Sequence, residues 1–464
     1  MLVLNVLLHM IVQRIEQMTK VKNFKDEYFY DLELSGEGLF SGRLLQGSDA
    51  LLMSAIKQTH HPIFLTHQEL IIHGQGTIAF TFQANTSFGI VLSENTAILG
   101  ADEPVVCLEI GFHQTVFKKK LSDDSDAIIA LIEKPCNTDA FLDINRVQTY
   151  WLSIDKENRL LRFGKGYMLH KLVLFEAELP RSGEAEEDAY AYIEKLKFIS
   201  LMGDFTQEIL STINSSFWKF PVTVDLPPVV TSSNEVTLDM PDQGTSTVIN
   251  NLSEECGVLY GNVAGQRVVL NTPDFPGFAD AINYSIITKG CMLYEKLKEK
   301  KGEFGHSDLN ETYLRITVGV NKGNSPGVPF VLEIWPGGHY SPIHNHSNCN
   351  AIIKVLHGSI QCNWYRGLSA YEKEPYDFCE LKKDEVTWLN SRQFQTHKLH
   401  NINPKGEMCA TIQCYMYDTN DIHHYEYFDY IDADDTLQHF TPNSDWEFGE
   451  FKVELKKEWN SRLL

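Results

Sequence analysis

Paired cysteines of the kinds that build disulfide frameworks, zinc sites or redox motifs are missing from this sequence. Its nine cysteines are scattered, and no two of them are separated by only two residues. Small secreted domains space their cysteines as a regular framework, and structural zinc sites use closely spaced pairs. We therefore interpret the cysteines as free thiols in a reducing compartment, and we expect a cytoplasmic protein.

Positive charge and long apolar runs are also scarce. The chain has 40 lysines and arginines against 62 aspartates and glutamates, which gives a formal net charge of −22. Nucleic acids and anionic membrane surfaces bind basic patches, so we expect neither as a partner. Residues 1–12 are apolar, but a membrane-spanning helix needs about 20 residues, and the basic start and cleavage site of a signal peptide are absent. We expect an amphipathic helix there, or an extension ahead of a start at Met18.

Glycine-rich nucleotide loops and alternating strands and helices are absent from the first half of the chain. Residues 25–180 instead show strand-like alternation, as in Ile78–Ala84, and short apolar runs such as Phe88–Leu92 and Val105–Ile110. Regularly spaced short strands are typical of sandwiches and jelly rolls. A length of 464 residues suggests two or three domains, and we expect the first to be this β-sandwich.

Part of this region resembles a known family. The segment Tyr150–Gly166, together with Phe82-x5-Phe88, is similar to the signature of the farnesoic acid O-methyltransferase-like domain. Because no nucleotide loop accompanies it, we expect a binding or scaffolding sandwich for a ligand or protein that the sequence does not identify. Residues 181–234 follow, with helical spacing at Ile193, Leu196 and Ile199 and then a Pro-rich stretch. We interpret them as a helical segment and linker.

The most informative stretch of the second half runs from Trp335 to His346. Successive side chains on a strand alternate between faces, so His344 and His346 point the same way and can hold one metal ion. A third ligand is expected from a neighbouring strand. His397 is the leading candidate because it follows the strand-like segment Val386–Leu389.

These residues lie in a spacing that resembles the two metal motifs of the cupin barrels, namely Gly338-x5-His344-x-His346-x4-Ala351-x6-Gly358 and His397-x3-Asn401. Most cupins have a Glu ligand where this chain has Ala351. Without it, a bound divalent ion keeps its full double charge and open positions on one face, which suit a thiolate. Three-histidine cupins of this type are thiol dioxygenases, and the resemblance is to cysteine dioxygenase. It implies a cupin β-barrel over residues 235–430 with a few leading helices, including a helical run over Ala279–Lys300.

The resemblance also implies roles for further residues. Arg315, in a Tyr313-x-Arg315 segment, matches the arginine that holds the substrate carboxylate, and Trp335 matches a tryptophan before the Gly-rich turn. A planar guanidinium fits a carboxylate bidentately. Tyr417 matches the tyrosine over the iron. Gln413, Tyr415 and His400 are expected near the metal without binding it.

The family's animal members join that tyrosine to a cysteine through a thioether. Ala351 occupies the matching position here, so the crosslink is expected to be absent; Cys349 is the one nearby cysteine that could replace it. Residues 431–464 are expected to be an acidic, charged tail with a short helix.

The sequence as a whole predicts a mostly β enzyme, an Fe2+-dependent dioxygenase that converts cysteine or a related small thiol carboxylate and O2 to the sulfinate. Three alternatives remain open. The thiol could be 3-mercaptopropionate or cysteamine, the reaction could be another cupin reaction, or the protein could be a non-catalytic metal- or thiol-sensing cupin with a ligand-binding sandwich. Three imidazoles suit several divalent metals, so the spacing alone does not select iron.

Overall fold

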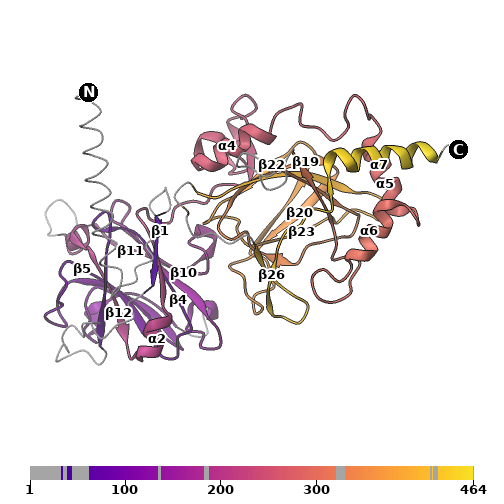
Figure 1. The fold of residues 1–464 in the computed structure, drawn as a ribbon. Coiled ribbons are helices and arrows are strands. Elements are labelled where there is room, and N and C mark those ends of the chain that lie inside the picture. The colour runs from indigo at the N-terminus through magenta and orange to yellow at the C-terminus, as the bar shows by residue number, and fades with distance from the viewer. Residues whose placement is uncertain are drawn as a thin grey trace, which may run out of the picture. The chain divides into compact units, whose positions relative to one another are not determined.

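The computed structural model describes residues 33–34, 39–43, 62–133, 137–181, 188–319, 330–418, 421 and 427–462. The apolar start at residues 1–12 lies outside this part of the chain. The chain divides into two compact units (Figure 1). The first unit ends at Val222, and the second begins at Thr223 and also takes in Leu169–Leu172. The mostly β architecture expected from the sequence is confirmed.

The amino-terminal unit consists of two antiparallel sheets with an apolar core between them. The first sheet has the order β1 (Glu33–Leu34), β2 (Leu39–Arg43), β13 (Asn214–Trp218), β4 (Gln75–Phe82), β9 (Gln148–Asp155), β10 (Leu160–Lys165), β11 (Val173–Glu178). The second has the order β3 (Ile63–Glu69), β12 (Phe198–Gly203), β5 (Phe88–Ser93), β6 (Val105–Ile110), β7 (Gln114–Lys118), β8 (Ile128–Glu133). The predicted sandwich is therefore present.

The prediction that residues 181–234 form a helical segment and linker is wrong for much of that range. Strand β12 pairs with β3 and β5, and β13 pairs with β2 and β4, so both complete the sandwich. The spacing of Ile193, Leu196 and Ile199 arises because a 3-10 helix at Ala191–Lys195 runs into β12, and all three side chains are buried in the core. The α-helix in this range is the short α2 (Gln207–Thr212).

The carboxy-terminal unit is also built from two sheets that enclose a shared core. The larger has the order β15 (Thr247–Val248), β14 (Val229–Thr231), β22 (Val386–Leu389), β19 (Asn350–His357), β24 (Cys409–Met416), β17 (Phe330–Trp335), β16 (Leu314–Val318), β27 (Trp446–Glu447). The smaller has the order β21 (Asp377–Lys382), β20 (Ser359–Trp364), β23 (His397–His400), β18 (Ile343–His344), β25 (Phe428–Ile431), β26 (Leu437–Phe440). The cupin resemblance had implied a closed barrel. In the described residues the two sheets do not close into one barrel but form a sandwich.

Helices accompany the larger sheet, and they are α3 (Asp239–Asp242), α4 (Glu254–Val263), α5 (Phe278–Ile287), α6 (Met292–Lys300) and α7 (Phe448–Ser461) (Figure 1). The predicted single helical run over Ala279–Lys300 is two helices, because Gly290 adopts a φ of 88° between α5 and α6. A positive φ suits glycine and ends a right-handed helix. No helix in the described part of the chain is both long and apolar enough to cross a membrane.

The expected charged tail at 431–464 is part of the folded unit. Strand β26 pairs with β25, and β27 runs parallel to β16. Helix α7 buries Phe451 and Leu455 completely in the core. The charges that suggested a tail lie in the turn between β25 and β26, which contains Asp432, Asp434 and Asp435, and along helix α7, so composition alone was misleading.

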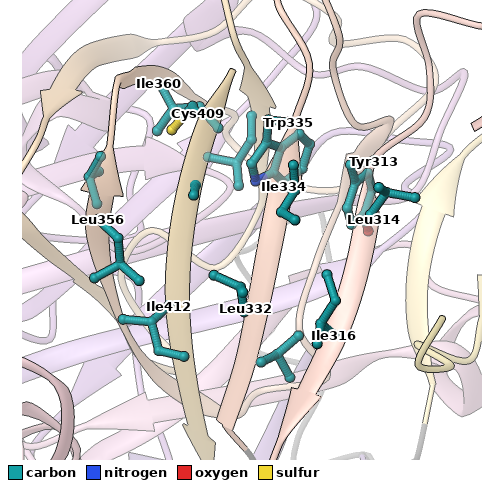
Figure 2. Close-up of a cluster of buried hydrophobic side chains, with 14 of the residues drawn as sticks. Tyr313, Leu314, Ile316, Leu332, Ile334, Trp335, Leu356, Ile360, Cys409 and Ile412 are labelled. Carbon is teal, nitrogen blue, oxygen red and sulfur yellow. The ribbon is translucent and has the colours of Figure 1, made fainter. Parts of the chain in front are cut away.

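The central strands of the larger sheet are buried on both faces. Figure 2 shows the apolar residues of β16, β17 and β24, which include Leu314, Ile316, Leu332, Ile334 and Ile412. Tyr313 and Trp335 also appear there, at the ends of their strands. The residues between these apolar ones point to the other face, because side chains alternate along a strand. That other face lies toward the smaller sheet and carries the polar side chains of the site.

Candidate metal centre

Strand pairing brings the three predicted histidines together. His344 on β18 lies directly opposite His397 on β23, and His346 follows two residues after His344. One ligand nitrogen from each of the three lies within 4.8 Å of the others. Their ring centroids are 4.6 to 4.8 Å apart. This is a convergent set of three nitrogen donors.

Hydrogen bonds hold each ring in one orientation. Nδ1 of His344 lies 3.1 Å from the Pro342 carbonyl, and Nδ1 of His346 lies 3.2 Å from the Gln395 carbonyl. A carbonyl only accepts, so each Nδ1 carries the proton and Nε2 presents its lone pair. In His397, Nε2 is buried and has no hydrogen-bond partner among the described residues. An unpartnered buried nitrogen beside two others fits a metal ligand.

The electrostatics of the cluster keep the rings neutral. Burial lowers the pKa of His344 to about 4. Burial and the neighbouring imidazoles lower the pKa values of His346 and His397 well below their ordinary range. Neutral imidazole is the form that binds a metal, so no proton has to leave near neutral pH.

No carboxylate completes the cluster among the described residues. Ala351, which stands where a Glu ligand would be, is fully buried and lies across from Tyr415 in the sheet. The donor set fits a divalent ion such as Fe2+, Zn2+, Ni2+ or Cu2+. Such an ion would keep its double charge, because all three donors are neutral.

A pocket that opens to solvent lies beside the three histidines. Its walls are largely aromatic, and they include Phe304, Tyr313, Trp335, Tyr415, Phe428, Tyr430 and Phe440. Among the other lining residues, Arg315, Glu333 and Gln413 are polar. Pockets for small ligands combine apolar walls with a few convergent polar groups in this way.

Arg315 lies in the cavity wall as expected, but it is already paired. Its guanidinium donates to the carboxylate of Glu333, its cross-strand neighbour, and the two residues are only 5% and 2% exposed. Burial opposes the charge of Arg315, but Glu333 and nearby tyrosines more than offset this and raise its pKa. Burial raises the pKa of Glu333 to about 6, although Arg315 acts against that.

Sequence reasoning missed Glu333. The signal was available, since Glu333 is a lone charge within the apolar strand Phe330–Trp335. Tyr313 and Trp335 stack with ring centroids 4.1 Å apart and both line the cavity, with Tyr313 also hydrogen-bonded to Arg315. They support the wall that holds Arg315.

Two tyrosines of the pocket lie beside the histidines: Tyr430, the cross-strand partner of His344, and Tyr415. The ring of Tyr415 stacks near His346 with centroids 6.0 Å apart, and its hydroxyl donates to Gln413. Tyr417, the residue expected over the metal, lies just beyond the end of β24 and packs half-buried against the core. It is not among the residues that line the cavity. Alternation predicted that Tyr415 and Tyr417 lie on one face of β24. Only Tyr415 lies within the part of β24 that pairs with β19.

The remaining candidates lie outside the cluster. His400 is three residues from His397 on β23, so it faces away, and its ring packs near Tyr340. Asn401 is fully buried and donates to the carbonyls of Trp335 and Glu407 at 2.8 and 3.0 Å. It ties the end of β17 to the segment that carries His397.

Comparison with known proteins finds only remote similarity. No family model matches the chain. A cupin domain of a transcriptional regulator from Enterobacter cloacae is 11% identical, with 23% of this chain and 96% of that chain covered and a TM-score of 0.18. A DMSP lyase from Ruegeria pomeroyi is 15% identical over 24% of this chain and 49% of its own, also with a TM-score of 0.18. An oxalate oxidase bound to glycolate is 14% identical over 25% of this chain and 55% of its own, with a TM-score of 0.19.

Each of these solved structures matches about a quarter of this chain. At these identities and TM-scores they carry no argument about what this chain does.

Proposed function

We propose that the carboxy-terminal unit is an Fe2+-dependent thiol dioxygenase that converts cysteine, or a related small thiol carboxylate, and O2 to the sulfinate. The observation that supports it best is the cluster of three neutral imidazoles without a carboxylate, two of them buried and His344 partly buried, beside a cavity lined by an arginine. His344, His346 and His397 would hold the ion. When bound, the ion supplies a site that favours the thiolate over the thiol and that brings sulfur and O2 together.

The overall reaction needs no further reductant. One thiol and one O2 give one sulfinic acid, because both oxygen atoms pass to sulfur and its four-electron oxidation matches the four-electron reduction of O2. The protein therefore has to bind and orient two small reactants and exclude water.

Arg315 would orient the carboxylate of the substrate. A guanidinium has five N–H donors, and the contacts with Glu333 and Tyr313 use only some of them. Tyr415 provides a hydroxyl group beside the histidines, and Gln413 fixes its direction. The expectation that Tyr417 acts at the metal is not carried into this proposal.

The aromatic walls would keep bulk water from the reacting sulfur. Phe428 lies with its ring centroid 4.8 Å from that of His346, and Phe304 packs edge-on to Tyr430. A low-dielectric cavity strengthens the pairing of a bound carboxylate with Arg315.

Oxygen uptake by anaerobically iron-loaded protein, measured with cysteine, 3-mercaptopropionate and cysteamine, tests the proposal. We expect one O2 consumed for each sulfinate found by mass spectrometry. His344→Ala protein is the matched control and should consume none. Full metal loading without uptake for any thiol would favour a metal- or thiol-sensing protein instead.

The other expectations also remain proposals. The eight cysteines in the described residues are all free thiols, which supports a reducing, cytoplasmic location. We propose that the amino-terminal sandwich binds a ligand or a protein, since its apolar interior is filled by its own side chains and its surface is what remains for recognition.

A further inference from the structure

Four buried polar residues cross the cavity wall from strand to strand, and we call them the polar line: Arg315 on β16, Glu333 on β17, and Gln413 and Tyr415 on β24. Arg315 is the direct cross-strand partner of Glu333, and Glu333 that of Thr411, two residues from Gln413. All four line the cavity and are at most 8% exposed. The line ends at Tyr415, beside His346.

Each member of the polar line is held by the next. One carboxylate oxygen of Glu333 accepts from Arg315, and the other accepts from the side-chain amide of Gln413. The amide oxygen of Gln413 accepts from the Tyr415 hydroxyl. Glu333 is therefore fixed as a carboxylate inside the wall, and its charge cannot move away when a ligand enters.

This arrangement changes the charge that a ligand meets. An arginine alone would make the wall cationic and would attract any thiol acid. With Glu333 directly beside Arg315, these two wall charges sum to zero, so the wall adds no net charge to that of an ion held by the three histidines. In a low-dielectric cavity, one unit of charge at this distance strongly alters the binding of an ionic ligand.

We propose that Glu333 is a specificity-determining residue that offsets Arg315, so that the cavity accepts thiols carrying an ammonium group better than Arg315 alone would allow. The inference rests on the proposed function, and it adds the amine that Arg315 alone does not require. A ligand whose carboxylate binds Arg315 and whose ammonium group is tolerated because of Glu333 is an α-amino acid that carries a thiol.

A purely structural Glu333 would behave differently. If Glu333 served only to pair Arg315, its loss would weaken the binding of every thiol by a similar factor or would destabilise the carboxy-terminal unit. A charge effect instead depends on the charge of the ligand and changes the ratio between ligands of similar size. Cysteamine, cysteine and 3-mercaptopropionate form such a series, with net charges from the amine and carboxylate of +1, 0 and −1.

The experiment measures dissociation constants of these three thiols by calorimetry on full-length protein loaded with Zn2+, where no turnover interferes. For Glu333→Gln we expect the ratio of cysteamine to 3-mercaptopropionate affinity to shift toward 3-mercaptopropionate by about tenfold or more, with cysteine between them. A ratio within about twofold of the wild-type ratio, in a folded variant that binds Zn2+, would overturn the proposal.

Glu333→Gln leaves Arg315 buried without its partner, so the same change is also made in an Arg315→Gln background, where no unpaired guanidinium remains. We expect a shift in the same direction there, and the double variant should return close to the wild-type ratio. An absence of shift in either background overturns the inference alone. Wild-type protein that binds Zn2+ but none of the thiols overturns the proposed function and the inference with it.

Discussion

The two units are built alike but have different interiors. In the amino-terminal sandwich, β4, β5 and β9 contribute a continuous set of apolar and aromatic residues to the core, and these are Ile78, Phe80, Phe82, Phe88, Ile90, Leu92, Tyr150, Leu152 and Ile154. In the carboxy-terminal sandwich, β16, β17 and β24 turn Arg315, Glu333 and Gln413 inward. Burying such groups is costly unless they are paired. The first interior is filled by apolar packing, whereas the second contains paired polar groups beside the three histidines, as the proposed function requires.

The largest expected effect breaks the metal centre. Changing His344, His346 or His397 to Ala should abolish iron binding, because two imidazoles rarely retain a labile divalent ion. Metal analysis of purified protein checks this against wild-type protein with close to one iron per chain. His400→Ala, on the same strand but facing away, should keep its iron; the reverse pattern would show that the third ligand is assigned wrongly.

A core truncation in the amino-terminal unit should lower the stability of that unit without changing metal binding. Phe80 is fully buried between the amino-terminal sheets and packs edge-on against Phe217. Phe80→Ala should lower the unfolding free energy of that unit by about 3–5 kcal/mol. Denaturant titration measures the loss, and iron content should remain unchanged. A matching fall in iron content would mean that the apolar interior also supports the site.

Acid should destabilise the metal-free carboxy-terminal unit. The folded pKa of His344 is about 4, below the unfolded value near 6.5, so the unfolded chain takes up the proton first. Stability is therefore present above about pH 6.5 and is lost as pH falls toward 4, by about 3 kcal/mol for His344 if the shift is fully expressed. Urea titrations of chelator-treated protein between pH 7 and 4 test this. His344→Ala should flatten the dependence, and an unchanged slope in that variant would contradict the argument.

Replacing Arg315 should lower kcat/KM for thiols that have a carboxylate more than for thiols that lack one. For Arg315→Ala, kcat/KM for cysteine should fall by about thirty-fold or more, since a buried charge-assisted contact is worth about 2–5 kcal/mol. Cysteamine should be nearly unaffected or even improve relative to cysteine, because it has no carboxylate. Steady-state oxygen uptake on iron-replete protein makes the comparison. Equal losses on both thiols would show that Arg315 only supports the fold through Glu333.

The smallest expected effect is no change at all. Ala351 offers no sulfur, so Tyr415 and Tyr417 should remain unmodified. Cys349 is 1% exposed and lies just before Asn350, the residue that pairs with Met416 at the end of β24. Peptide mass mapping should find no loss of two hydrogens that joins Cys349 to either tyrosine, and such a loss would overturn this expectation.

Local patterns predicted what depends on local geometry. His344 and His346 could be placed on one side of a strand because alternation is a property of every strand. The sandwich followed from alternation in Ile78–Ala84, where one face is buried. The resemblance placed Arg315 in the cavity wall, but its partner could not be read from spacing, because Glu333 becomes its neighbour only through the pairing of β16 with β17.

Errors arose where tertiary pairing decided the outcome. Residues 198–218 include two strands whose partners lie more than a hundred residues earlier, so composition suggested a linker instead. Tyr415 and Tyr417 are two residues apart, so alternation alone places them on the same face. Because β24 ends at Met416, between them, their surroundings differ. Gly290 divides a continuous helical pattern into two helices through one positive φ.

The alternation that places apolar residues on one face of β16, β17 and β24 and the polar line on the other restricts which insertions and deletions this unit can accept. One residue added within β17 would turn Leu332 and Ile334 toward the cavity and Glu333 toward the opposite face, where it would have no partner. The side chains of the site and those of the apolar core alternate along the same strands, so both depend on a single strand register. Substitutions can change the ligand one position at a time, whereas length changes in these strands should be confined to the loops between them.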